Sequence, residues 1–171
     1  MMKEATIRRW EMEDKEGLMH LCNTVDRTFL SDRLPYPYKE EDAVAWLTMV
    51  SEQDGKEGVF RAIVFEDEII GSISVEKNGN DEGDIGYMLL TNYWSKGIMT
   101  KAVSVACHIA FEELNLHQIT GSVYEPNVAS TKVLEKNGFV YERRINDGTI
   151  MNGERHHINV YKFIKKRTFT T

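Results

Sequence analysis

The sequence predicts an α+β fold, a mixed α/β domain in which one central, mixed but mostly antiparallel twisted sheet is flanked by helices. Two patterns support this fold class. First, some segments have apolar residues at every second position, and others have them at every third or fourth position. These strand-like and helix-like segments follow one another in the order βααβββαβαββ. Three of the strands are joined by short polar turns, which favours antiparallel pairing. Because the chain has 171 residues, we expect a single domain over residues 1–171.

The first third of the chain predicts one strand and two helices. Residues 5–10 are short and β-capable, and Glu13 and Asp14 then open a helix whose apolar residues are Leu18, Leu21, Cys22 and Val25. Pro35 and Pro37 interrupt the helical pattern, because each proline lacks a backbone donor and restricts the residue before it. A second helix follows, and the polar run at 51–58 ends it. Its apolar face comprises Ala43, Trp46, Leu47 and Val50.

The remaining elements follow from the same two periods. Residues 60–65, 69–75 and 84–90 alternate as three consecutive strands. The clearest helix comes next, with Ala102, Val105, Ala106, Ile109, Ala110 and Leu114 at helical spacing. A strand at 119–124 precedes a short helix at 128–136, which Asn137 and Gly138 terminate. Two paired terminal strands, 139–145 and 158–164, are expected to surround a loop rich in Asn and Gly.

Composition and charge exclude several classes of protein. The formal net charge of −6 argues against a nucleic-acid-binding protein. No run approaches the roughly 18 to 20 apolar residues that span a bilayer, and residues 1–10 lack an apolar signal core, so we expect a cytoplasmic protein without membrane contact. Cys22 and Cys107 have no CxxC spacing and are expected to be buried thiols. His156 and His157 are adjacent and would face opposite ways on a strand, so no metal site is expected.

The junction between the third central strand and the long helix is a candidate phosphate-binding site. A strand that passes through a glycine-containing turn into a helix exposes unpaired amides at the positive end of the helix dipole. Gly97 allows a ligand to approach the backbone, and Lys96 and Lys101 add positive charge. The segment has neither the P-loop pattern nor the GxGxxG pattern, so nucleotide hydrolysis and dinucleotide binding are not indicated.

Together with the helix at 127–139, this junction resembles the GNAT superfamily of acetyl-CoA-dependent N-acetyltransferases, and within it the ribosomal-protein N-terminal acetyltransferase group. Four segments carry the resemblance: Leu34-Pro35-Tyr36-Pro37-Tyr38 with the following helix, Ile69-Ile70-Gly71-Ser72-Ile73, Ile85-Gly86-Tyr87 through Lys101-Ala102, and Asn127 through Phe139. The family's pyrophosphate loop falls on residues 94–99. Trp94 stands here where the family usually has Arg or Gln, and Met99 where it usually has Gly or Ala.

The resemblance implies acetyl-CoA as the co-substrate and assigns residues to it. The strand that begins at Ile85 would splay from its neighbour, and the backbone of residues 88–90 would pair with the pantetheine arm. The cofactor-binding residues that the resemblance implies are Met88, Leu89, Leu90, Ser95, Lys96, Gly97, Ile98, Met99, Thr100, Lys101, Asn127 and Lys132. A homodimer is compatible with the resemblance, because dimers are frequent among relatives.

The predicted chemistry is direct attack of a neutral amine on the thioester in a ternary complex. Ser130 would donate a proton to the departing thiol as a general acid, and the amide of Leu89 or a neighbour would stabilise the oxyanion. Asp84 is preferred to Glu76 as the general base, on position alone. Neither cysteine has an evident base partner, so a covalent cysteine intermediate is not expected.

Three hypotheses for the function stay open. The leading one is the α-amine of a protein or peptide N-terminus of the ribosomal type, with residues 35–46 lining the acceptor groove. The second is a polyamine, an aminoglycoside or another small amine, which an acidic protein would also attract. The third, of a different class, is an acyl-CoA-binding sensor without catalytic activity.

Overall fold

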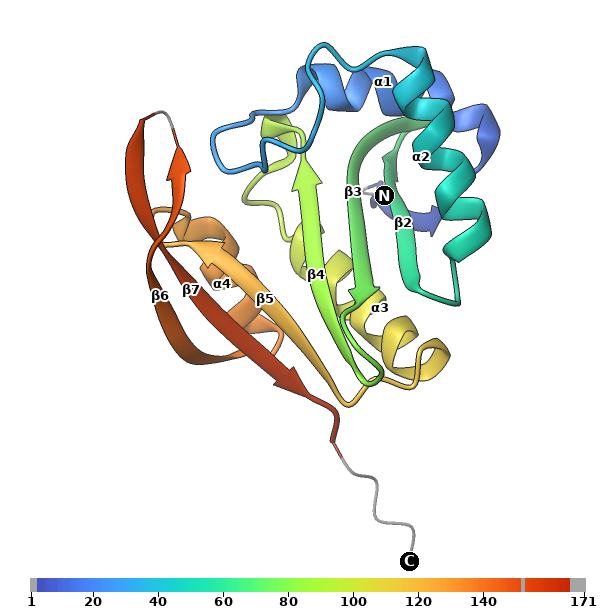
Figure 1. Cartoon of the computed structure of the whole chain (residues 1–171). Coiled ribbons are helices and arrows are strands. Elements are labelled where there is room, and N and C mark those ends of the chain that lie inside the picture. Colours follow the sequence, from blue (N-terminus) through green and yellow to red (C-terminus); the bar gives the residue numbers. More distant parts are fainter. Residues whose placement is uncertain (1–2, 152, 167–171) are drawn as a thin grey trace, which may run out of the picture.

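A seven-stranded sheet forms the centre of the computed structural model, which describes residues 3–151 and 153–166. Its strands are β1 (Thr6–Arg9), β2 (Gly58–Phe65), β3 (Glu68–Lys77), β4 (Glu82–Leu89), β5 (Gln118–Tyr124), β6 (Val140–Met151) and β7 (Glu154–Ile164). The helices are α1 (Lys15–Thr24), α2 (Glu40–Gln53), α3 (Ile98–Glu113) and α4 (Val128–Lys136). The order of elements and the mixed, mostly antiparallel sheet confirm the predicted fold class (Figure 1).

The sheet order is β1-β2-β3-β4-β5-β7-β6, and one pair differs from the others. All neighbouring strands are antiparallel except β4 and β5, which are parallel and pair only between residues 82–85 and 118–121. Beyond Ile85 and Gly121, β4 stays with β3 and β5 stays with β7. We call the unpaired continuations, residues 86–89 of β4 and 122–124 of β5, the strand divergence.

Helices cover both faces of the sheet. Trp46 of α2 packs against Phe60 of β2 on one face, whereas Leu134 of α4 lies over Gly121 of β5 on the other, together with α3 (Figure 1). Strand β2 is buried along seven of its eight residues, because it is covered from both sides. Its continuous apolar run, rather than a strict alternation, follows from that double burial.

The terminal hairpin is longer than predicted. Residues 146–148 were expected to lie in a loop between short strands, but β6 continues to Met151 and β7 begins at Glu154. The register shifts between Ile145 and Thr149, so the extra residues are absorbed as a bulge in which Asp147 adopts a left-handed backbone with φ 49°. The ladder then resumes with Thr149 opposite His156, and the prediction of two short strands is therefore wrong.

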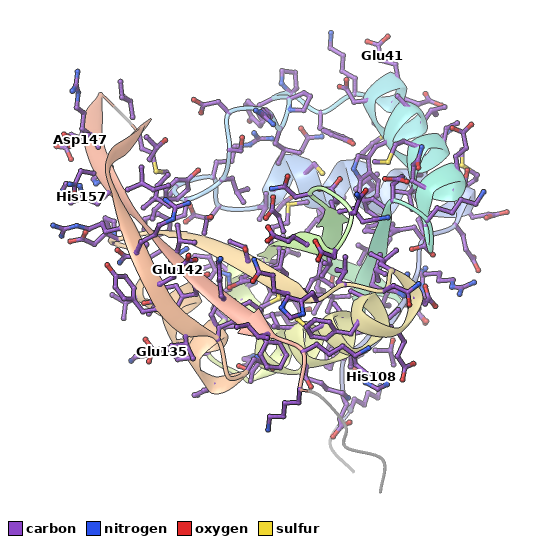
Figure 2. All side chains as sticks on the ribbon, turned by 60° about the horizontal axis from the view of Figure 1, so that its bottom comes forward. Glu41, His108, Glu135, Glu142, Asp147 and His157 are labelled. Atoms are coloured by element: carbon purple, nitrogen blue, oxygen red, sulfur yellow. The ribbon has the colours of Figure 1, made fainter. Side chains whose placement is uncertain are left out.

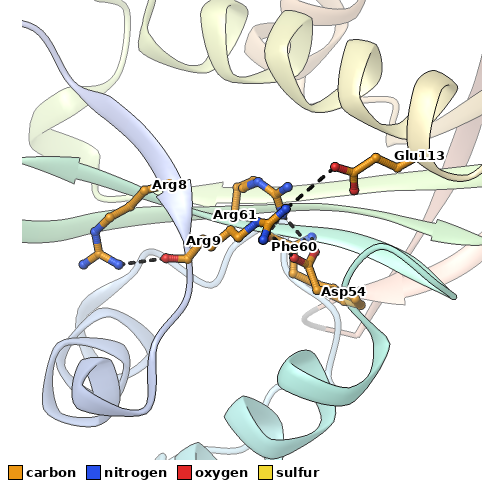
Figure 3. Close-up of polar contacts among 6 residues, drawn as sticks. All are labelled: Arg8, Arg9, Asp54, Phe60, Arg61 and Glu113. Carbon is orange, nitrogen blue, oxygen red and sulfur yellow. Dashed lines mark hydrogen bonds and ion pairs between the residues drawn. The ribbon is translucent and has the colours of Figure 1, made fainter.

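A buried ion pair joins the end of α2 to β2. The Arg61 side chain is only 6% exposed, and its guanidinium donates to Asp54 Oδ1 and to the Phe60 carbonyl, each at 2.8 Å (Figure 3). Arg9 of β1 lies 3.7 Å from the second Asp54 oxygen and 3.8 Å from Glu113 at the end of α3. One carboxylate therefore connects β1, α2 and β2.

We predict that Asp54→Ala lowers the free energy of unfolding by about 3 kcal/mol, because it leaves the buried Arg61 charge without a partner. The measurement is urea denaturation followed by circular dichroism. Glu112→Ala is the control, since it removes the exposed His108–Glu112 pair on α3 and should cost less than about 0.5 kcal/mol. Equal losses in the two variants would contradict the structural importance of the Asp54–Arg61 pair.

Candidate active site

The strand divergence leaves backbone groups of β4 without a strand partner. The Leu90 amide donates to the Ile70 carbonyl at 2.8 Å, so Leu90 directs its backbone polar groups toward β3. Because this direction alternates along a strand, Met88 also faces β3, whereas Leu89 and Tyr87 face the divergence. Among the three residues predicted to pair with the pantetheine arm, only Leu89 presents both amide and carbonyl there.

The start of α3 offers a row of unpaired amides close to this strand end. The first helical bond runs from the Lys101 amide to the Gly97 carbonyl at 3.2 Å, so the amides of Ile98, Met99 and Thr100 have no acceptor within the helix. Gly97 has φ 78° and makes no side-chain cap. Met99 is buried in the core with 8% exposure. Its side chain therefore does not cover the unpaired amides at the start of α3.

Trp94 ties the loop before α3 to the end of β4. Its indole Nε1 donates to the Leu89 carbonyl at 2.8 Å, although the side chain is 43% exposed. Ser95 then adopts a left-handed backbone with φ 61°. This contact was not predicted, because a hydrogen bond from a side chain to a carbonyl five residues earlier has no sequence pattern. The bond holds the loop that leads into α3 against the end of β4.

The predicted cationic residues are less directly engaged. The Lys96 ammonium lies 5.7 Å from the centroid of the Tyr93 ring, and Lys101 lies 3.4 Å from Glu4. Lys132 is exposed on α4. All three are surface side chains, so the backbone amides rather than these charges define the geometry of the phosphate-binding end.

The N-terminus of α4 lies at the strand divergence. Asn127 caps it, since its Oδ1 accepts from the Ser130 amide at 3.2 Å. The Ser130 hydroxyl lies 2.5 Å from the Tyr87 hydroxyl of β4. Burial raises the pKa of Tyr87 to about 12, while the hydrogen bond to Ser130 acts in the opposite direction. The structure thus brings Asn127 and Ser130 of α4 beside Tyr87 of β4.

Asp84 stands apart from that group. It lies three positions before Tyr87, so the two side chains project from opposite faces of β4. It belongs to the paired part of the strand, opposite Glu76 on β3 and Thr120 on β5. Its exposed carboxylate accepts a hydrogen bond from Asn78 at 3.0 Å in the β3–β4 turn. The structure therefore does not bring Asp84 and Ser130 together.

The segment between α1 and α2 contributes less surface than predicted. Tyr38 is 5% exposed, and Trp46 packs edge-on against Trp10 with ring centroids 5.2 Å apart. Both side chains are used in packing, and the lining of an acceptor groove by residues 35–46 stays a prediction. Tyr36 is 70% exposed, and Arg27 lies 4.8 Å from its ring centroid while donating to the carbonyls of Leu34 and Pro35.

The two cysteines are poor nucleophiles. Cys22 and Cys107 are free thiols with 1% and 3% exposure. Burial raises the pKa of each to about 12. Since the thiolate is the reactive form, this agrees with the expectation that no cysteine forms a covalent intermediate.

Other candidate features contribute no additional site. Within residues 3–151 and 153–166, no three His, Cys, Asp or Glu side chains gather as a metal ion would require. Figure 2 shows His108 on α3 and His157 on the terminal hairpin, well apart. The His157 Nδ1 accepts from the Asp147 amide at 3.1 Å.

Over residues 3–151 and 153–166, no helix is long and apolar enough to cross a membrane.

This arrangement belongs to a known class of enzymes. The family model described as acetyltransferase (GNAT) domain matches residues 5–140, and the chain belongs to that family. It is an acetyl-CoA-dependent N-acetyltransferase. The resemblance inferred from the sequence motifs is therefore confirmed.

Individual relatives differ in the acceptors that their names give. The putative ribosomal N-acetyltransferase YdaF of Bacillus subtilis (strain 168) is 28% identical over 131 residues, which are 75% of this chain and 70% of the relative. The ribosomal-protein-S5-alanine acetyltransferase from Vibrio fischeri has a TM-score of 0.83 and 24% identity, covering 96% of this chain and 94% of that one. A spermidine N-acetyltransferase variant from Vibrio cholerae has a TM-score of 0.76 and 21% identity, covering 94% and 93%. At these identities the two structures establish the shared fold.

We predict that Gly97→Ala weakens acetyl-CoA binding at least about tenfold and costs about 1 kcal/mol of stability, because a Cβ disfavours the left-handed backbone that opens α3. Isothermal titration calorimetry and thermal unfolding measure the two effects. Gly79→Ala is a matched control in the β3–β4 turn: its φ is 89°, and an added Cβ at either glycine meets nothing within 4 Å. It should lose similar stability and keep its affinity. An equal loss of affinity in both variants would contradict a role of the 94–99 loop in binding.

Proposed function

We propose that this chain transfers the acetyl group of acetyl-CoA to the α-amine of a protein N-terminus, with ribosomal proteins as the leading class of acceptor. The proposal rests on three features: the amides that open α3 without an acceptor in the helix, the edge of β4 at Leu89 that β5 does not pair, and the Ser130 hydroxyl beside Tyr87 of the same strand. The acceptor class is supported by the names of the relative from Bacillus subtilis and the structure from Vibrio fischeri.

The donor side is defined by backbone groups. The amides of Ile98, Met99 and Thr100 would bind the pyrophosphate at the positive end of α3, which spans sixteen residues. The amide of Leu89 would pair with the pantetheine arm, in place of the strand partner that β4 lacks, while the Leu89 carbonyl accepts from Trp94 Nε1 at 2.8 Å. Acetyl-CoA supplies the activated acyl group. Asn127, which caps α4, and Lys132 on α4 would contribute further contacts to it.

The chemistry then requires two proton transfers. A neutral amine attacks the thioester carbon, the C–N bond forms, and the C–S bond breaks with its electron pair passing to sulfur. The amine gives a proton to a base or to water, and Ser130 would donate a proton to sulfur as a general acid. An unpaired β4 amide, that of Leu89 or a neighbour, would stabilise the oxyanion. No covalent enzyme intermediate is needed.

Two alternatives stay open, and particular observations support the first. A polyamine acceptor is supported by the structural likeness to a spermidine N-acetyltransferase and by the net charge of −6. The carboxylates labelled in Figure 2, Glu41, Glu135, Glu142 and Asp147, lie on α2, α4 and β6 and form no single patch. A binding module without catalytic activity would retain the amides of α3 and show no turnover. The cytoplasmic location stays a prediction from the sequence.

We predict that kcat/KM for a peptide with a free N-terminal amine rises with pH and levels off near pH 8, because the pKa of an α-amine is about 7.7 to 8.0. For a primary aliphatic amine, whose pKa is about 10.4, the rise would continue toward pH 10. Thiol release from acetyl-CoA measures both, over pH 6 to 10.

The matched control is the same peptide with a blocked α-amine and one internal lysine, which should be acetylated at least about 100-fold more slowly at pH 7. Spermidine as the better substrate by kcat/KM would favour the polyamine alternative. Tight CoA binding with no turnover on peptides or small amines would favour the non-catalytic module.

The predicted base is tested by Asp84→Asn with turnover measured between pH 6 and 9. A general base at this position would show a loss of about 100-fold or more, largest at low pH. The position of Asp84 on the face opposite to Tyr87 favours unchanged turnover, with water accepting the amine proton. Glu82→Gln removes another exposed carboxylate of the same strand and is the control. A large loss confined to Asp84→Asn would establish the sequence-based assignment.

A further inference from the structure

The hydroxyls of Tyr87 and Ser130 meet across the strand divergence. Tyr87 lies on β4, two residues beyond the last residue that pairs with β5, and Ser130 lies in the first turn of α4, which packs on β5. The hydroxyl oxygens are 2.5 Å apart, and the Tyr87 oxygen is 3.4 Å from the Ser130 carbonyl. The contact therefore joins the two halves of the sheet where their backbones have separated.

The backbone around Ser130 is already held in place. Asn127 accepts from the Ser130 amide at 3.2 Å, and the Thr131 hydroxyl donates to the Asn127 carbonyl at 3.3 Å. What the cap does not determine is the direction of the Ser130 O–H bond, because a hydroxyl hydrogen rotates to suit its neighbours. A second group must settle that direction if Ser130 is to donate to one particular atom.

Tyr87 is suited to be that group. A phenol is a stronger acid than an aliphatic alcohol, so in the Tyr87–Ser130 pair the phenol is the favoured donor and Ser130 Oγ the favoured acceptor. The Ser130 hydrogen is then directed away from Tyr87. Burial keeps the Tyr87 hydroxyl protonated through the neutral range, since its pKa is raised to about 12.

We propose that Tyr87 is a positioning residue for catalysis: its hydroxyl donates to Ser130 Oγ and directs the Ser130 O–H toward the sulfur that leaves at the strand divergence. The inference rests on the proposed function. When the C–S bond breaks, its electron pair goes to sulfur, the Ser130 proton passes to sulfur, and a solvent proton returns to Ser130. The Tyr87 hydrogen bond stabilises the charge that develops on Oγ in between, because a bonded hydroxyl chain polarises cooperatively.

The test compares Tyr87→Phe, Ser130→Ala and the double variant with wild type, in steady-state thiol release with acetyl-CoA and the best acceptor found. We expect Tyr87→Phe to lower kcat about tenfold and Ser130→Ala about 100-fold, with KM values for both substrates within twofold of wild type. Because Tyr87 acts through Ser130, adding Tyr87→Phe to Ser130→Ala should lower kcat no further.

Tyr161→Phe is the control for loss of a tyrosine hydroxyl elsewhere in the sheet; this buried residue of β7 packs edge-on against Tyr141. It should leave kcat and KM unchanged. A purely structural role for Tyr87 would instead raise the KM for acetyl-CoA, lower the unfolding temperature and add to the effect of Ser130→Ala, and any such additive pattern would overturn the proposal.

Failure of the proposed function gives a different result. If wild type binds CoA but acetylates no amine, the function and the Tyr87 role are both overturned. An active wild type whose Tyr87→Phe variant keeps full kcat overturns the Tyr87 role alone.

Discussion

The early end of the parallel pairing between β4 and β5 is the constraint on which the site depends. Pairing stops at Ile85 and Gly121, while each strand continues with its outer neighbour. Gly121 is needed at that point, because a Cβ there would lie 2.7 Å from Leu134 of α4. The close approach of α4 at this glycine holds the helix against β5, and its first turn meets β4 through Ser130 and Tyr87. Unpaired backbone of β4 and the N-terminus of α4 therefore lie at the divergence.

An opening of this kind weakens a sheet unless other contacts span it. The Tyr87–Ser130 contact joins β4 to α4, and Asn137 at the end of α4 donates to the Thr100 carbonyl in the first turn of α3 at 3.1 Å. Toward the β1 edge of the sheet, the Asp54–Arg61 pair holds α2, β1 and β2 together. The polar contacts near the divergence thus stabilise both the site and the fold.

Much of this architecture was predictable, for identifiable reasons. Periodicity located most strands and helices, because one-sided burial imposes a period on apolar residues, whereas β2 is a continuous apolar run that is buried from both sides. It failed at residues 146–148, where Asn, Asp and Gly are as compatible with a bulge as with a loop, and only pairing with β7 distinguishes the two. The sequence alone does not say whether Trp46 contacts a ligand or packs in the core. Only the tertiary structure shows that it packs against Trp10.

The sequence by itself determined the fold class and the family, and the local signals at Gly97 and in the segment 127–139 predicted where the donor would bind. The tertiary structure decided which atoms face which. It separated Leu89 from Met88 and Leu90 by strand parity, turned the Met99 side chain into the core, and placed Asp84 on the face away from Ser130. It also brought Tyr87 to Ser130, forty-three positions away. Such contacts arise from strand register and helix packing over long separations, which no local pattern encodes.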